Sequence, residues 1–153
     1  MSIAERLAEL GLQLPDPPQP QGEYVPVVVH DGIAQVSGQV SRQGDTVIVG
    51  PVTADTPPGV VAHAGQACTL RALSALGSAI GGLDNMSRIL FVRGFVHAQA
   101  GFQGHSSVLD EVSRLMVAIF GDCGRHARSA VGVAGLPGGG MLEIEVTAAV
   151  TVS

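Results

Sequence analysis

The chain has no tryptophan and no lysine, and it is poor in aromatic and charged side chains. All eight of its basic residues are arginines scattered along the chain, the formal net charge is −5, and the aromatic residues are one Tyr and four Phe. Neutralising a row of phosphates requires clustered cations, and stacking on bases requires aromatic rings. These absences argue against nucleic acid as a partner.

Cysteines and long apolar runs are also scarce. Cys68 and Cys123 are far apart and form no CxxC motif, so we expect reduced thiols and neither a disulfide nor a zinc site. No apolar run reaches the roughly 18–20 residues that a membrane-spanning helix needs. Glu5, Arg6 and Glu9 interrupt the N-terminal leucines, which is unlike a signal peptide. These features predict a cytoplasmic protein without a membrane partner.

Apolar residues are abundant: they occupy 46% of the 153 positions, whereas charged residues occupy 14%. A chain of this length and composition can bury the core of one domain. The mean hydropathy of +0.36 is high for a small monomer, which rarely exposes a large apolar patch. We therefore expect a second copy of the chain to cover part of the surface.

The N-terminal 21 residues differ from the remainder. Ser2 and Glu5 have the spacing of a capping box, and apolar residues then recur at helical intervals up to Gly11. Four prolines between residues 14 and 22 exclude a helix there. We expect residues 1–21 to form a helix and a Pro-rich linker that pack on a domain formed by residues 22–153.

Within 22–153 the pattern alternates between strands and helices. The Asp31-Gly32 pair predicts a hairpin, and Ser107 is the expected N-cap of the second long helix, which ends at Gly121. The predicted strands are 25–30, 33–39, 46–49, 89–96, 127–133 and 141–150, and the predicted helices are 59–80 and 107–120. This order favours an α+β fold, a single-layer sheet covered on one face by two helices. The other face needs a partner.

Two separated motifs resemble one known family. The first is Tyr24 followed by Ser37-Gly38-Gln39, and the second is the segment from 127 to 137 (Ala-Arg-Ser-Ala-Val-Gly-Val-Ala-Gly-Leu-Pro) followed by Leu-Glu-Ile-Glu at 142–145. Together they are similar to the signatures of the YjgF/RidA proteins, the reactive intermediate deaminases historically called the L-PSP endoribonuclease family. The resemblance extends over about residues 22–152.

The resemblance implies a fold like that of trimeric bacterial chorismate mutase and a homotrimer with clefts between subunits. It also implies hydrolysis of reactive enamines and imines of amino-acid metabolism to keto acids and ammonia, without a cofactor. By the same resemblance, Arg128 would bind the substrate carboxylate and Glu143 would orient or activate water. Tyr24, Ser37 and Ala130 would line the pocket. Many family deaminases have Cys where this chain has Ala130. The second motif therefore departs from theirs at this position, and the resemblance there does not by itself imply turnover.

The residues themselves leave alternatives open. Strand alternation places Arg128 beside the small Ala130 and Gly132, which leaves space for a carboxylate, but Arg128 could equally pair with Glu143 or Glu145. The two glutamates share one strand face and could be a solvated edge. The alternative function is a non-catalytic binder of small carboxylates. The acidic charge speaks against the endoribonuclease of the older name.

Other motifs predict no chemistry. The five histidines have no tight ligand spacing, so no metal site is expected. The glycines from 132 to 140 precede a strand and not the helix that a phosphate-binding loop needs, so they predict a turn. Ser37 lacks the Gly-x-Ser-x-Gly context of a nucleophile.

Overall fold

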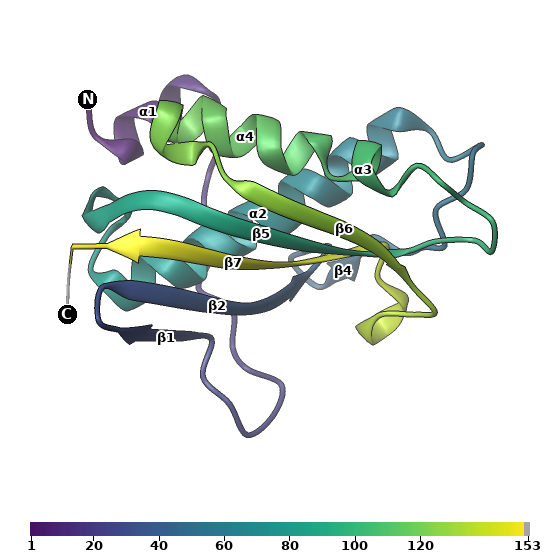
Figure 1. Ribbon diagram of the computed structural model, residues 1–153, viewed down its shortest axis with the longest axis horizontal. Helices are drawn as coiled ribbons and strands as arrows, with labels where there is room; N and C mark the ends of the chain where they lie inside the picture. Colours follow the sequence, from purple (N-terminus) through teal and green to yellow (C-terminus); the bar gives the residue numbers. More distant parts are fainter. Residues whose placement is uncertain (152–153) are drawn as a thin grey trace.

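The computed structural model describes residues 1–151 and forms two layers, a twisted sheet and a layer of helices on one of its faces (Figure 1). The helices in chain order are α1 (Ile3–Glu9), α2 (Pro58–Ile80), α3 (His105–Val108) and α4 (Asp110–Phe120), with short 3-10 turns at η1 (Leu83–Asn85), η2 (Gly121–Gly124) and η3 (Pro137–Gly139). The strands are β1 (Val27–His30), β2 (Ile33–Val40), β3 (Arg42–Gln43), β4 (Thr46–Val47), β5 (Met86–His97), β6 (Ala127–Val133) and β7 (Leu142–Val150).

The main sheet has the order β1-β2-β7-β5-β6, and only the β5–β6 pair is parallel. The last strand of the chain, β7, therefore occupies the middle of the sheet. Helix α2 crosses behind the sheet. Helix α4 lies beside α2, over β5 and β6 (Figure 1). The α+β fold predicted from the sequence, with one sheet covered on one face by helices, is confirmed.

The core lies between the sheet and the helices. Strand β7 alternates strictly between buried and half-buried residues, with Leu142, Ile144 and Val146 pointing toward the helices. Helix α2 presents fully buried leucines at 73 and 76 to the same layer. No helix within residues 1–151 has both the length and the apolar character that crossing a bilayer requires.

The opposite face of the sheet carries no helix and is partly apolar. Register places Phe91 and Phe95 of β5 on this open face, together with Val131 of β6, which pairs with Phe95. Val131 is 49% exposed, and Val28 of β1 is 53% exposed. Large exposed apolar side chains across one sheet face mark a surface suited to covering by another chain.

The N-terminal segment packs on the helical layer. The capping box is present, since the Ser2 hydroxyl accepts from the backbone N–H of Glu5 and the Glu5 carboxylate accepts from that of Ser2. The Arg6 Nε donates to the carbonyl of Ala118 in α4 at 2.8 Å. Farther along, the carbonyl of Pro15 accepts from the Ser74 hydroxyl of α2. The linker is thus held along α2 before it reaches β1.

One expectation about the elements was wrong, and another was right only in part. Ser107 does not cap the second long helix, because it lies inside the short helix α3, and α4 begins only after Leu109. Leu109, the residue between the two helices, is fully buried and lies against Gly94. The strand predicted at 46–49 is β4, which pairs with β3 in a separate two-stranded sheet. The Asp31-Gly32 hairpin is confirmed, with both residues at positive φ.

Candidate functional site

A β-bulge in β2 creates the candidate site. Val36 pairs with Val146 of β7 and Gln39 pairs with Ile144, so Ser37 and Gly38 together oppose the single residue Glu145. A bulge of this kind bends the strand and interrupts its ladder. Strand β1 pairs only with the part of β2 before the bulge, and the Ser37 N–H instead donates to the carbonyl of Pro26 at 2.8 Å. The edge of β2 beyond the bulge is therefore left without a neighbouring strand.

Gly38 makes room for the carboxylate of Glu143. The register pairs Glu143 with Val40, and the strand alternation turns its side chain away from the core. A Cβ atom at position 38 would lie 2.8 Å from Glu143 Cδ and would press against Oε1. Unbonded carbon atoms pack at about 3.5–4.0 Å, so only glycine at position 38 allows this placement of the carboxylate.

Half-burial changes the acidity of Glu143. Burial raises the pKa of its carboxyl above the ordinary value of 4.5, and the nearby Glu145 carboxylate raises it further. Desolvation and a like charge both disfavour the ionised form. A carboxyl shifted in this direction moves closer to the range in which it can accept and return a proton near neutral pH.

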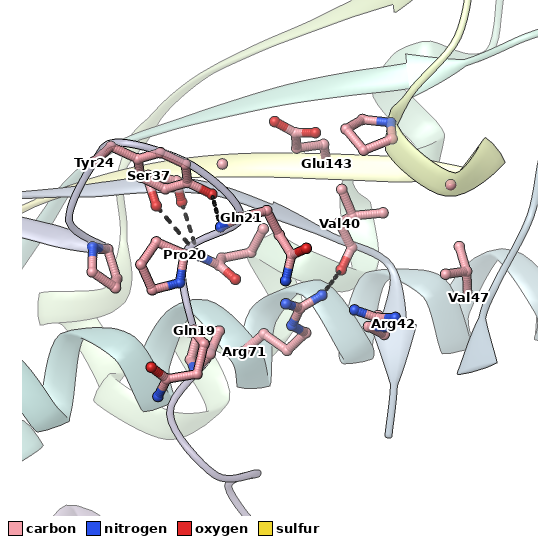
Figure 2. A pocket seen from close by; sticks show the side chains of 16 residues that line it. Gln19, Pro20, Gln21, Tyr24, Ser37, Val40, Arg42, Val47, Arg71 and Glu143 are labelled. Carbon is pink, nitrogen blue, oxygen red and sulfur yellow. Dashed lines mark hydrogen bonds between the residues drawn. The ribbon is translucent and has the colours of Figure 1, made fainter. Parts of the chain in front are cut away.

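The site is a cavity of about 450 Å³ over the free edge of β2. Ser37, Gly38 and Glu143 line it from the sheet, Tyr24 lines it from the segment before β1, and the linker residues 18–21 close it from the side. The Tyr24 hydroxyl accepts from the Gln21 N–H at 3.1 Å, which fastens the linker to the cavity wall. Figure 2 shows the Tyr24 ring and the Glu143 carboxylate toward one side of this pocket.

Two arginines that the sequence analysis did not single out line the other side of the pocket (Figure 2). Arg42 belongs to β3 and Arg71 to the middle of α2. One guanidinium N–H of Arg71 donates to the carbonyl of Val40 at 3.1 Å. Each is an isolated arginine in the sequence, and nothing local distinguishes them from surface arginines. Only the folded chain brings them together.

Arg128 lies elsewhere in the chain, on the edge strand β6. Its register partner is the buried Val92, so its side chain lies on the helical face of the sheet. There its guanidinium donates to Asp110 at 3.3 Å, to the Ser113 hydroxyl at 3.0 Å, and to the hydroxyl and carbonyl of Ser106 at 2.8 and 3.1 Å.

The predicted site residues thus fall into two groups. Tyr24, Ser37 and Glu143 share one pocket, as the first motif and the end of the second suggested. Arg128 and Ala130 lie two strands away from β7, on the helical face of β6, and do not line this pocket within one chain. Arg128 pairs with Asp110 of α4 and with neither glutamate of β7. Within residues 1–151, no three His, Cys, Asp or Glu side chains are grouped to hold a metal ion.

Comparison with known proteins places the chain in a family. Residues 4–144 match the family model described as "YjgF/chorismate mutase-like, putative endoribonuclease". Protein TCP17 of Trypanosoma cruzi is 34% identical over 148 residues, which cover 94% of this chain and 91% of that protein.

Solved structures agree with this match. Atu1372 of Agrobacterium tumefaciens, a protein described as having unknown function, superposes with a TM-score of 0.88 at 31% identity, covering 99% of this chain and 93% of that one. Escherichia coli TdcF, solved with bound serine, superposes with a TM-score of 0.59 at 25% identity over 87% of this chain and 92% of its own. The resemblance carried by the two sequence motifs is confirmed: this chain belongs to the YjgF/chorismate mutase-like family.

Proposed function

We propose that this protein hydrolyses small enamine and imine intermediates of amino-acid metabolism to keto acids and ammonia. The observation that carries the proposal is the placement of Glu143, a half-buried carboxyl with a raised pKa, in a pocket with Tyr24 and Ser37. TdcF, a member of the same fold, was solved with serine bound, which is consistent with an amino-acid-derived ligand.

The chemistry requires little beyond positioning. The imine carbon is already electrophilic, so water adds to it when held nearby, and the Glu143 carboxylate accepts the proton that the water loses. The resulting carbinolamine carries the former imine nitrogen as an amine. For a protonated imine, Glu143 returns the proton to this nitrogen, the C–N bond breaks and ammonia leaves, and the hydroxyl proton passes to the Glu143 carboxylate as the carbonyl forms. Ammonia then takes up that proton, so Glu143 is ionised again. Atoms and protons balance without an oxidant or a cofactor.

Arg128 is proposed to hold the substrate carboxylate from a neighbouring subunit. Within one chain it lies outside the Glu143 pocket, so a combined site needs a second copy. Asp110, which contacts Arg128, is 70% exposed at its side chain and can be displaced by a ligand carboxylate. The Ser106 and Ser113 contacts would then keep the guanidinium oriented.

A homotrimer in the cytoplasm is the assembly that we propose. The apolar open face, with Phe91, Phe95 and Val131, supports association through the sheet. Sedimentation equilibrium tests this step, and a monomer at all accessible concentrations would rule out a site that is shared between subunits.

The activity is tested by generating enamines with an amino-acid dehydratase and timing keto-acid release. We expect release faster than in buffer alone, and a loss of this acceleration in Glu143→Gln and Arg128→Gln. Decay of several such substrates at the buffer rate would sink the hydrolase proposal for them.

A non-catalytic binder of small carboxylates is the second candidate. It is favoured by Ala130, which supplies no functional group where many family deaminases have a thiol. Calorimetric titration with 2-ketobutyrate distinguishes the two: saturable binding that depends on Arg128, in a protein without turnover, identifies a binder.

A further inference from the structure

Arg42 and Arg71 form a pair of cations that the proposed hydrolysis does not use. Their guanidinium groups lie close together in Figure 2. Burial lowers the pKa of Arg71, and the positive charge of Arg42 lowers it further. Both side chains are half-buried, so their repulsion is less screened than it would be on an open surface.

No carboxylate of residues 1–151 forms an ion pair with either arginine. Asp16 and Asp45 line the adjoining cavity but make no such contact. The Arg42 Nε is buried without a hydrogen-bond partner, and the one bond of Arg71 goes to the neutral Val40 carbonyl. A buried donor without a partner and two neighbouring cations without a counterion are both costly, and an anion relieves both costs.

The space around the pair is suited to a small polar ligand. The two arginines line both the 450 Å³ cavity of Glu143 and an adjoining one of about 460 Å³, which runs between the linker and α2. The side-chain amides of Gln19, Gln43 and Gln66 supply further hydrogen-bonding groups there.

The donors suit a carboxylate, and they lack the helix N-terminus that many phosphate sites use. Phosphate sites commonly use backbone N–H groups at a helix N-terminus. Here the cavity lies against the middle of α2, and the donors are guanidinium groups and amides. A planar guanidinium matches the two oxygens of a carboxylate, and two unneutralised positive charges favour a ligand with two negative ones.

We propose that Arg42 and Arg71 form a binding site for a small dicarboxylate beneath the Pro-rich linker. The site belongs to a single chain, uses neither Arg128 nor Glu143, and goes beyond the proposed hydrolysis.

Isothermal titration of the full chain with succinate, acetate and inorganic phosphate tests the proposal. We expect one succinate per chain, bound at least about tenfold more tightly than acetate, since each charge-assisted hydrogen bond contributes a factor of that order. Arg42→Met and Arg71→Met should each weaken succinate binding by about tenfold or more. Arg125→Gln, at an exposed arginine, is the matched control and should bind as the wild type does.

Two readouts keep the test independent of folding defects. In the wild type, the Nε–Hε resonance of Arg42 should shift on titration with succinate, because that donor gains a partner. The melting temperature of Arg42→Met should not fall, because the Arg42 side chain makes no hydrogen bond or ion pair within residues 1–151 and its removal relieves repulsion.

Three outcomes overturn the proposal: no saturable succinate binding, phosphate binding as tight as succinate, or succinate binding that is lost in Arg128→Gln and retained in Arg42→Met. Because no imine is present in these titrations, their failure leaves the hydrolysis proposal standing. A lack of hydrolysis likewise leaves the dicarboxylate site standing.

Discussion

Gly38 can be changed to alanine without altering a charge. The backbone of Gly38 is outside the positive-φ region, so alanine fits the local conformation. Its Cβ atom would lie 2.8 Å from Glu143 Cδ, where about 3.5–4.0 Å is needed, so the carboxyl must retreat by about 1 Å.

The retreat should affect catalysis far more than folding. A displacement of about 1 Å in a reacting geometry lowers rates by about 100-fold, so we expect Gly38→Ala to hydrolyse enamines about 100-fold more slowly. The free energy of unfolding should change by less than about 1 kcal/mol, because the atoms that must move are the far end of a flexible side chain.

Keto-acid release and urea denaturation measure the two effects on the same preparation. Gly135→Ala is the matched control, since a Cβ atom there meets nothing within 4 Å, and it should keep full activity. If Gly38→Ala folds normally and turns over at the wild-type rate, then the position of the Glu143 carboxylate against Gly38 does not matter for turnover, and the assigned role is wrong.

Three further predictions test the core, the carboxyl and the thiols. Gly94→Ala would place a Cβ atom 2.5 Å from Leu109 Cγ in the core, so the free energy of unfolding in urea should fall by about 1–3 kcal/mol, and an unchanged midpoint would contradict the packing. Burial raises the pKa of Glu143, so the ionised carboxylate destabilises the folded chain. At a pH above the pKa of Glu143 in the folded protein, Glu143→Gln should therefore have a higher melting temperature than the wild type. This difference in melting temperature should shrink as the pH falls toward 4.5. A difference in melting temperature that stays constant across this pH range would contradict the raised pKa of Glu143. Burial also raises the pKa of the Cys68 thiol, whereas Cys123 is exposed, so a disulfide reagent should titrate one thiol in the native protein and two in denaturant.

Local rules predicted most of the fold. The capping box of α1, the apolar spacing of α2 and the alternation of β7 each depend on residues a few positions apart, and each is present in the structure. The contact of Leu109 with Gly94 was not predictable in this way, because Gly94 belongs to another element and meets Leu109 only after folding.

The site was predictable only in part for the same reason. Tyr24, Ser37 and Glu143 were found through the two family motifs, and they share one pocket. The arginine pair was missed, since β3 and α2 are separated by many residues and neither arginine stands in a motif. The partner of Arg128 is Asp110 of α4, a contact that strand alternation cannot reveal.

The extra residue in β2 has a consequence for how this chain tolerates insertions and deletions. Removing either Ser37 or Gly38 would restore one-to-one pairing with β7 and let β2 run straight. The strand would gain regular hydrogen bonds, and every residue after the deletion would remain on its present face because its partner on β7 is unchanged. Such a shortened chain would lose the bulge that places Ser37 and Gly38 beside Glu143, so at this point the sequence carries one residue that regular strand pairing does not require.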